Sequence, residues 1–211
     1  MATYKPEVFE TASLDEAQAI ILTPEGDSST EARWRTETPW MLERVRAALQ
    51  FGATRLVMDF GCGVGRISRG LLEDEKLAVL GLDASASMRR MAVEHVDSTR
   101  FSALSPEALD AMVDAGLRCD AVLAVWVLQH CLDPAKELDR IRASLRRGGQ
   151  FFIVDMHHRA VPTDEGWIDD GFSVRELVDA RFECIRREPF AAPGSPQNLL
   201  QSGWVGVYRK P

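Results

Sequence analysis

One stretch of the chain, residues 57–66, joins an apolar run to three closely spaced glycines and a carboxylate. It reads Val-Met-Asp-Phe-Gly-Cys-Gly-Val-Gly-Arg, and Leu56 extends the apolar run toward the N-terminus. An apolar run without alternation is typical of a strand buried on both faces, and glycines are typical of backbone that approaches a ligand closely. The stretch therefore predicts a buried strand, a ligand-binding glycine loop and a helix over residues 67–72.

The spacing of these glycines argues against a dinucleotide site. Such sites use G-x-G-x-x-G and place a pyrophosphate at the N-terminus of the helix. Here the third glycine comes one residue early, at Gly65, and Arg66 occupies the position where the third glycine should fall. Asp59 adds a negative charge beside the loop, which favours a cationic or hydroxyl-bearing ligand. An NAD-dependent oxidoreductase is therefore the weaker interpretation.

The pattern D-x-G-x-G-x-G resembles the first motif of the class I S-adenosylmethionine-dependent methyltransferases of small-molecule type. The resemblance implies that the loop wraps the methionine part of S-adenosylmethionine and that the acid lies near its ammonium. The cofactor carries an ammonium and a sulfonium and no phosphate, which agrees with a carboxylate at this place. The cofactor-binding residues implied by this motif are Asp59, Gly61, Cys62, Gly63 and Gly65.

Asp83 ends the predicted second strand, 24 residues after Asp59, where a carboxylate can accept hydrogen bonds from ribose hydroxyls. Capping of the next helix is an alternative role that can coexist with this one. The acidic residue that the family commonly places after the third strand is missing, so Ser102 and the Ala103 N–H are the candidates for adenine recognition. The remaining cofactor residues implied by the resemblance are Ala84, Met88, Val125 and Trp126.

Three histidines are candidate catalytic residues. His130 follows the predicted fourth strand in a V-L-x-H sequence that resembles the family's fourth motif, and His157 and His158 follow the predicted fifth strand. Unperturbed histidine titrates near pH ~6.5 and can act as a general base for a hydroxyl acceptor. Packing and hydrogen bonding at a helix start is the alternative role of His130. His157 and His158 have no further ligand at i+3 or i+4, so no metal site is expected.

Strand-like and helix-like segments alternate along the central part of the chain, which predicts a parallel sheet with helices on both faces. The resemblance implies an α/β, Rossmann-like, doubly wound sheet of seven strands in the order 3-2-1-4-5-7-6, mostly parallel with one antiparallel strand. Residues 189–202 contain three prolines and are predicted to be a loop. The predicted strands are 56–58, 78–82, 100–103, 120–125, 150–155, 182–188 and 203–208. The predicted helices are 67–72, 85–95, 106–115, 135–147 and 174–180.

About fifty residues precede the first strand. We expect residues 1–50 to form a helical arm or lid and residues 51–211 to form the cofactor-binding domain. A threonine cap followed by proline predicts a helix over residues 38–49, and residues 14–22 are a second candidate helix. A loop is expected at residues 24–29. In the resembled family such N-terminal helices often cover cofactor and acceptor.

Composition restricts the partners and the compartment. The 211 residues carry a formal net charge of −7, which opposes a strong sequence-independent grip on nucleic acid. Four arginines in the predicted helix 135–147 are expected to lie on a solvated face. No apolar run approaches the ~20 residues of a membrane span, no secretory signal is evident, and the four cysteines form no C-x-x-C pair. These features predict a cytoplasmic chain with no membrane partner.

The sequence as a whole predicts an S-adenosylmethionine-dependent methyltransferase that transfers a methyl group to an oxygen or nitrogen atom. The expected partner is a small-molecule acceptor, with no nucleic acid. The candidates for an aromatic lining of the acceptor pocket are Trp34, Trp40, Trp126, Trp167 and Phe172. A protein methyltransferase and a non-catalytic module that binds S-adenosylmethionine are the alternatives left open.

Overall fold

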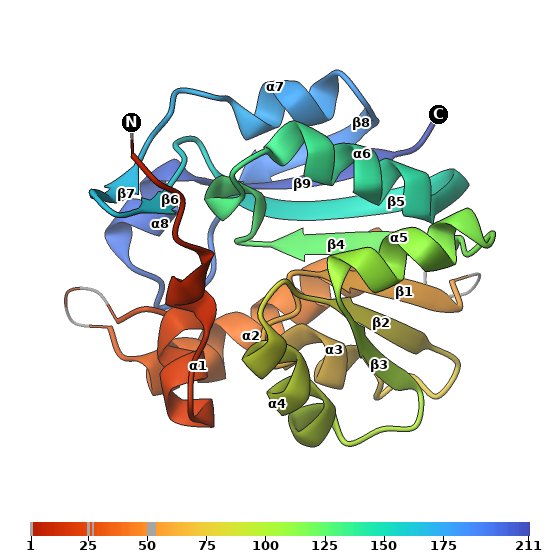
Figure 1. The fold of residues 1–211 in the computed structure, drawn as a ribbon, viewed down its shortest axis with the longest axis horizontal. Coiled ribbons are helices and arrows are strands. Elements are labelled where there is room, and N and C mark those ends of the chain that lie inside the picture. Colours follow the sequence, from red (N-terminus) through yellow and green to blue (C-terminus); the bar gives the residue numbers. More distant parts are fainter. Residues whose placement is uncertain (1, 25, 27, 50–53) are drawn as a thin grey trace.

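The computed structural model describes residues 2–24, 26, 28–49 and 54–211, which form a central sheet with helices on both faces (Figure 1). The sheet has seven strands in the order β3-β2-β1-β4-β5-β9-β8. Strands β1 to β5 are parallel, and β9 runs antiparallel to both β5 and β8. This confirms the predicted fold class and strand order. The strands are β1 Leu56–Phe60, β2 Ala78–Leu82, β3 Phe101–Leu104, β4 Cys119–Val125, β5 Leu145–Met156, β8 Glu183–Pro189 and β9 Gly203–Arg209.

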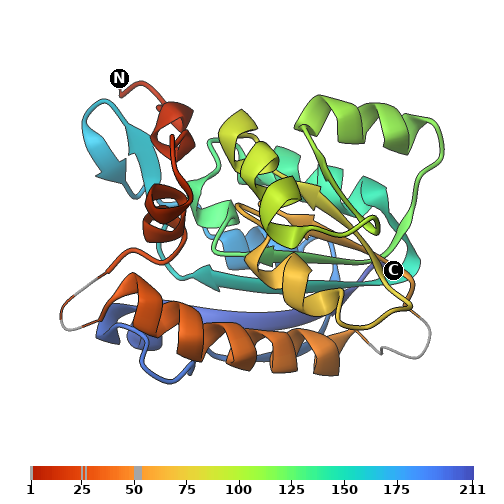
Figure 2. The ribbon, with the colours of Figure 1, turned by 90° about the horizontal axis from the view of Figure 1, so that it is seen from below.

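Alternate residues of the central strands feed two cores because successive side chains point to opposite faces. Val57 and Val79 pack with α2, α3 and α4, whereas Met58 and Ile153 pack with α5, α6 and α7. Figure 2 shows α2 lying along one side of the sheet. The helices are α1 Leu14–Ile21, α2 Thr30–Ala48, α3 Arg66–Leu71, α4 Ala86–Val96, α5 Pro106–Asp114, α6 Pro134–Ser144, α7 Val174–Asp179 and α8 Gln197–Ser202.

Three predicted boundaries are wrong. Helix α2 begins at Thr30, eight residues before the expected start, because the Ser29 hydroxyl caps it and Pro39 is tolerated inside the helix. Strand β5 begins at Leu145, so Arg146 and Arg147 lie in a strand and not in the predicted helix 135–147. Pairing of Leu145 with Cys119 explains this early start. Helix α8 occupies the end of the predicted loop 189–202.

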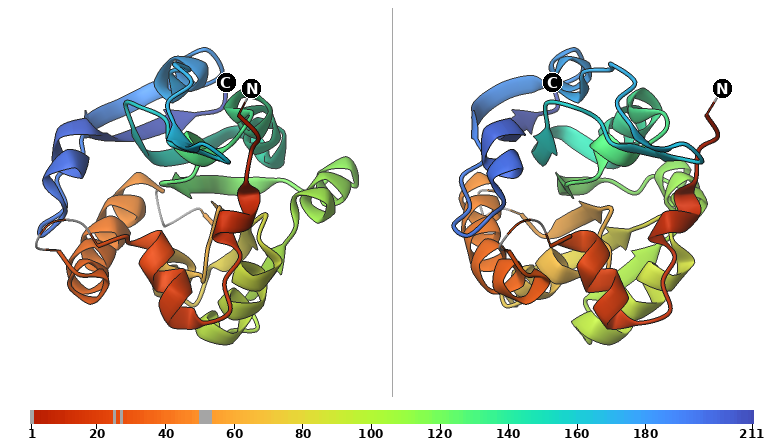
Figure 3. Two further views of the ribbon diagram at one scale, coloured as in Figure 1. Left: turned by 60° about the vertical axis from the view of Figure 1, so that its left-hand side comes forward. Right: turned by 90° about the vertical axis from the view of Figure 1, so that its left-hand side faces the viewer.

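A hairpin not predicted from the sequence lies between β5 and α7. It consists of β6 Val161–Thr163 and β7 Gly166–Ile168, each of three residues. The N-terminal segment of residues 3–11, here called the strap, pairs with this hairpin through a bridge between Tyr4 and Thr163. The strap contains the short 3-10 helix η1 Pro6–Phe9 and leads to α1, as the two views in Figure 3 show.

Helix α1 packs against the glycine loop and α4. Ala17 of α1 forms a small apolar cluster with Val64, Met88 and Met91. The expected division of the chain at residues 50 and 51 lies outside the described residues, as does part of the expected loop 24–29. Within the described ranges, no helix combines the length and apolar character that crossing a bilayer requires.

Candidate functional site

The glycine loop between β1 and α3 has a backbone that only glycine adopts without strain. Gly61, Gly63 and Gly65 have φ values of +73°, +53° and +78°, all in the left-handed region. A Cβ atom on Gly61 would lie 2.3 Å from a methyl carbon of Val127, and one on Gly63 would lie 2.7 Å from Ile21. The loop is anchored to the end of β2, since the N–H groups of Gly61 and Cys62 donate to the Leu82 carbonyl at 2.7 and 2.9 Å. The three predicted glycines therefore shape a compact turn at the carboxyl end of the sheet.

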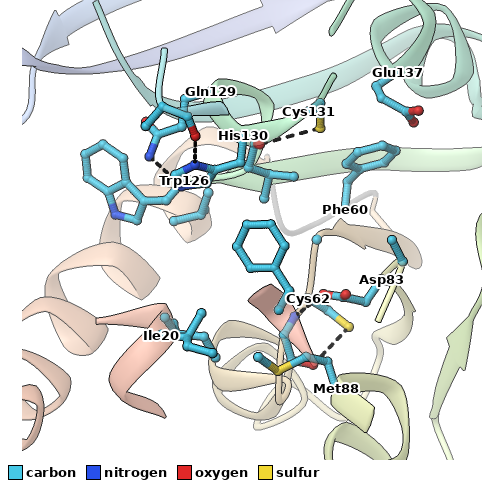
Figure 4. Close-up of a pocket in the computed structure, with 18 of the residues that line it drawn as sticks. Ile20, Phe60, Cys62, Asp83, Met88, Trp126, Gln129, His130, Cys131 and Glu137 are labelled. Carbon is cyan, nitrogen blue, oxygen red and sulfur yellow. Dashed lines mark hydrogen bonds between the residues drawn. The ribbon is translucent and has the colours of Figure 1, made fainter. Parts of the chain in front are cut away.

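A cavity of about 790 Å³ opens over this loop. That volume lies within the range of roughly 300–1,000 Å³ seen for small-ligand and cofactor pockets. Figure 4 shows Cys62, Asp83 and Met88 on one side, here called the loop side, and Trp126, Gln129, His130 and Cys131 on the other. The second side is called the η2 side, after the short 3-10 helix η2 Leu128–His130. Ten predicted site residues line the cavity: Asp59, Gly61, Cys62, Gly63, Asp83, Ala84, Met88, Val125, Trp126 and His130.

Five predicted site residues are not among the described residues that line the cavity. Gly65 is the N-cap of α3 and lies against Val96. Ser102 and Ala103 pair with Leu80 and Gly81 in the edge strand β3, and Pro106 lines the cavity instead.

His157 and His158 are the other two predicted site residues that are not among the described residues lining the cavity. Both are exposed beyond the end of β5, and one ring nitrogen of His158 lies 3.1 Å from the Ser202 hydroxyl. The prediction that they follow a strand end was right, but β5 continues to Met156, which lines the cavity in their place. The described residues that line the cavity therefore include neither histidine.

Two carboxylates lie on the loop side, Asp59 buried and Asp83 partly exposed. Asp59 is 3% exposed and accepts a hydrogen bond from the Ser68 hydroxyl at 2.7 Å. Burial raises the pKa of Asp59 to about 6, while the Ser68 bond and the charge of Arg66 act in the opposite direction. Burial also raises the pKa of Asp83, although its two oxygens accept N–H bonds from Ser85 and Gly63, each at 2.9 Å. A cation and hydroxyl donors are the groups that such carboxylates bind.

Two arginines on the cavity wall were missed in the sequence analysis. Arg33 is 3% exposed and forms a buried ion pair with Glu37 at 2.6 Å. Arg66 is 5% exposed, donates to the Thr38 hydroxyl at 3.2 Å and lies 5.7 Å from the centre of the Trp34 ring. Burial lowers the pKa of Arg66 to about 10. The i,i+4 spacing in Arg33 and Glu37 could have indicated an ion pair, but only the fold shows that the pair is buried beside the cavity.

Arg66 has one hydrogen-bond donor without a partner among the described residues, its buried Nε atom. A buried guanidinium with an unused donor is costly unless a ligand supplies an acceptor. Since Arg66 follows the glycine loop directly, an amino-acid carboxylate would find its counter-charge here and an ammonium would find Asp59 nearby.

His130 is held in one tautomer. Its Nδ1 atom lies 2.7 Å from the Ala160 carbonyl, which can only accept, so Nδ1 carries the hydrogen. Burial lowers the pKa of His130, which favours the neutral ring. The lone pair of Nε2 then accepts from the Gln129 side-chain amide at 2.9 Å. A substrate group that used Nε2 as a base would have to displace this amide.

Trp126 has an unusual backbone for a residue with a side chain. Its φ is +60°, directly after β4, and its N–H donates to the Val154 carbonyl at 2.8 Å. The indole packs edge to face on Phe190, with ring centres 4.8 Å apart, and its Nε1 atom lacks a partner in the described part of the chain. Strained backbone of this kind clusters at functional sites, which agrees with the predicted place of Trp126 on the cavity wall.

The features of the loop side fit S-adenosylmethionine. The cofactor's amino-acid end carries one positive and one negative group, and the cavity offers Asp59 and the unsatisfied Arg66. Its ribose carries two hydroxyls, and Asp83 offers a carboxylate at the end of β2. No phosphate has to be accommodated beside Asp59.

Comparison with known proteins gives a direct family match in the core of the chain. Residues 58–151 match the sequence profile of a methyltransferase domain. A tRNA U34 carboxymethyltransferase of Mannheimia succiniciproducens is 26% identical over 147 residues, which cover 64% of this chain and 44% of that protein. A ubiquinone biosynthesis O-methyltransferase of a Methylobacterium species is 33% identical over 102 residues, covering 48% and 41%. The chain therefore spans less than half the length of these two relatives.

Solved structures agree on the fold. The magnesium protoporphyrin IX methyltransferase of Synechocystis, crystallised with bound S-adenosylmethionine, superposes with a TM-score of 0.66 at 17% identity. The match covers 97% of this chain and 94% of that one. At this identity the likeness supports the fold alone.

These relatives contradict one prediction. The net charge of −7 led to the expectation of a small-molecule acceptor with no nucleic acid, yet several of the curated relatives are named as tRNA-modifying enzymes. That exclusion was wrong because net charge sums over the whole surface and does not report the potential around one cavity.

The profile match in residues 58–151, the seven-stranded order with its antiparallel β9, and the fit of the loop side agree with one another. Residues 58–151 are thus similar to methyltransferase domains, and the chain has the fold of the class I S-adenosylmethionine-dependent methyltransferases.

Proposed function

We propose that this chain binds S-adenosylmethionine on the loop side of the cavity and transfers its methyl group to an oxygen or nitrogen atom of an acceptor on the η2 side. The observation that carries the proposal is the meeting of three elements at one cavity. These are a glycine loop in left-handed conformation, a carboxylate at the end of β2 and the V-L-x-H segment after β4.

The residues of the loop side have separate binding roles in this proposal. Asp83 would accept hydrogen bonds from the ribose hydroxyls, Asp59 would attract the ammonium, and Arg66 would supply the positive charge for the carboxylate. Ala84 and Met88 lie against the remaining nucleoside. The opposite charges of Asp59 and Arg66 select a zwitterionic end over a neutral or doubly charged one.

The chemistry of the bound cofactor is an electrophilic methyl group on a sulfonium. Positioning is the main contribution of the chain, since well-oriented reactants gain on the order of 7–11 kcal/mol. Trp126 and Met156 form the apolar wall beside the acceptor and exclude water there. His130, already neutral and with its hydrogen on Nδ1, offers Nε2 to an acceptor proton once the Gln129 amide is displaced.

Calorimetry with S-adenosylhomocysteine and NAD tests the cofactor assignment. We expect the wild-type protein to bind S-adenosylhomocysteine and not NAD. Asp83→Ala should weaken this binding roughly 100-fold, because hydrogen bonds to a charged group contribute about 1.5–3 kcal/mol. Asp114→Ala, which removes an exposed carboxylate at the end of α5, is the matched control. Binding of NAD alone would contradict the proposal.

Transfer of labelled methyl groups from S-adenosylmethionine tests the methyl-transfer step of the proposal. The names of the relatives indicate total tRNA and a panel of small hydroxyl compounds as acceptors to offer, and a protein extract covers the protein alternative. Label in any of these acceptors supports methyl transfer, and His130→Asn should then lower kcat more than it raises KM. Cofactor binding without transfer to tRNA, protein or any compound of the panel would favour the non-catalytic alternative.

A further inference from the structure

The strap forms one wall of the cavity and is attached at both of its ends. Tyr4 and Phe9 line the cavity from the strap. At the first end, the Lys5 N–H donates to the Pro162 carbonyl at 2.9 Å, and the Asp164 N–H donates to the Thr3 carbonyl at 3.0 Å. This end therefore extends the β6–β7 hairpin by main-chain hydrogen bonds.

The ring of Phe9 ties the strap to the η2 side. Its centre lies 5.7 Å from that of His130 and 6.0 Å from that of Trp167. His130 and Trp167 also contact each other, with centres 5.4 Å apart. A shift of the strap would therefore change the surroundings of His130.

The second end of the strap is held by Glu10. Its carboxylate accepts the N–H groups of Ala86 and Ser87, at 2.8 and 3.0 Å, and the Ser87 hydroxyl. The Ser87 bond is the largest of the causes that lower the pKa of Glu10 to about 2. Glu10 is thus ionised at physiological pH and binds the first turn of α4, where a negative charge is favoured by the helix dipole.

Hydrogen bonds continue from this contact to the loop side. The hydroxyls of Ser87 and Ser85 lie 2.9 Å apart. The Ser85 N–H donates to one oxygen of Asp83 at 2.9 Å, and the Gly63 N–H donates to the other at 2.9 Å. Glu10 is not among the described residues that line the cavity. These hydrogen bonds nevertheless link it to Asp83, the carboxylate proposed to bind the ribose.

We infer that Glu10 is a positioning residue that couples closure of the strap to cofactor binding. The carboxylate clamps the strap on the same short segment that orients Asp83, so a ligand that holds Asp83 in place also stabilises the clamp. By thermodynamic linkage the clamp stabilises the bound ligand to the same extent. The inference rests on the proposed function, because it takes S-adenosylmethionine as the ligand.

Stopped-flow release of S-adenosylhomocysteine from the full chain, followed by tryptophan fluorescence, measures the coupling. Glu10→Ala should release the ligand about tenfold faster, with a much smaller change in the association rate, since related complexes differ mainly in dissociation. Glu10→Gln should fall between Glu10→Ala and the wild type. Glu7→Ala is the matched control, because Glu7 is an exposed carboxylate on η1 that forms no hydrogen bond or ion pair with α4 in the described part of the chain.

Hydrogen exchange of the unliganded chain provides a second measurement. Residues 3–11 should exchange faster in Glu10→Ala than in Glu7→Ala, while the core strands remain protected. Ser87→Ala completes a double-mutant cycle, in which the effects of Glu10→Ala and Ser87→Ala on ligand release should be strongly non-additive. Additive effects would mean that the two residues act independently.

The outcomes separate this inference from the proposed function. Ligand release from Glu10→Ala that matches Glu7→Ala, or unchanged exchange of residues 3–11, overturns the clamp while leaving cofactor binding intact. A wild-type chain that does not bind S-adenosylhomocysteine overturns the proposed function and the coupling together. If Glu10→Ala does not fold, Glu10→Gln and Ser87→Ala carry the same comparison.

Discussion

Asp59 shows how burial and ligand charge act on one residue. Its carboxylate is 3% exposed, and loss of hydration raises its pKa to about 6. A raised pKa means that the folded chain binds the proton more tightly than the unfolded chain does. Asp59 therefore opposes folding as pH rises through about 6, and a bound cation would offset part of that cost.

This pKa predicts the pH dependence of cofactor binding. Above pH of about 6 the carboxylate is ionised and attracts the ammonium, whereas protonation below this pH removes the attraction. We expect the affinity for S-adenosylhomocysteine to fall by up to about tenfold per pH unit below 6. Calorimetry at several pH values checks this, with Asp59→Asn as the variant that should bind more weakly and lose the dependence. A variant that kept the wild-type pH profile would show that another group is responsible.

Arg66 illustrates why single residues are hard to assign from sequence. In the sequence, Arg66 indicated only that the third glycine of a dinucleotide-binding motif is missing at this position. The fold adds Thr38 and Trp34, both from α2, and leaves Nε without a partner in the residues described. These contacts join residues 28 positions apart or more, which no local pattern reports.

At the scale of elements, α2 carries two ion pairs of the same spacing in very different surroundings. Arg33 and Glu37 have side chains that are 4% and 0% exposed, whereas Arg35 and Glu31 are 73% and 85% exposed. Glu37 also accepts a hydrogen bond from the Ser195 hydroxyl at 2.7 Å, so it joins α2 to the segment before α8. The buried pair and this bond therefore hold α2 against the segment before α8, and keep Arg33 in place at the cavity wall.

Removal of the glutamate from each pair should change the free energy of unfolding by very different amounts. Glu37→Ala leaves the Arg33 charge buried and should lower the free energy of unfolding by about 3–5 kcal/mol. Glu31→Ala on the same helix should change it by less than about 0.5 kcal/mol, because water screens the exposed pair. Urea unfolding followed by circular dichroism measures both. Equal effects of the two substitutions would contradict the argument from burial.

Element boundaries followed from sequence where the determinants are local. Helix α7 begins at Val174 as predicted, because the Ser173 hydroxyl accepts the Glu176 N–H and caps the helix. The β6–β7 hairpin was missed because strands of three residues are too short to show a period of two. Strand β5 extends back to Leu145 only because Cys119 provides a partner, which is a tertiary effect.

At the scale of the whole molecule, the cavity is built from segments spread along the entire chain. Its lining runs from Tyr4 in the strap to Leu199 in α8. A ligand in this cavity bridges elements that are otherwise joined mainly through the sheet. Cofactor binding should therefore stabilise the chain as one unit.

The size of that stabilisation can be predicted from mass action. S-adenosylhomocysteine at 100 times its Kd should raise the free energy of unfolding by about 2.7 kcal/mol. Thermal unfolding with and without ligand measures the shift, and NAD serves as the control ligand. Asp83→Ala should lose most of the shift at the same ligand concentration. An equal shift with NAD would show that the effect is not specific to the cofactor.

The amino-acid sequence by itself determined the sheet, the glycine loop and the two carboxylates at the ends of β1 and β2. These depend on hydrophobic periodicity and on backbone conformations that short segments specify. Only the tertiary structure decided that His130 faces the cavity while His157 and His158 do not, and that Arg33, Arg66 and the strap complete its walls. The physical reason is that burial, pKa and side-chain partners depend on residues distant in sequence that folding brings together.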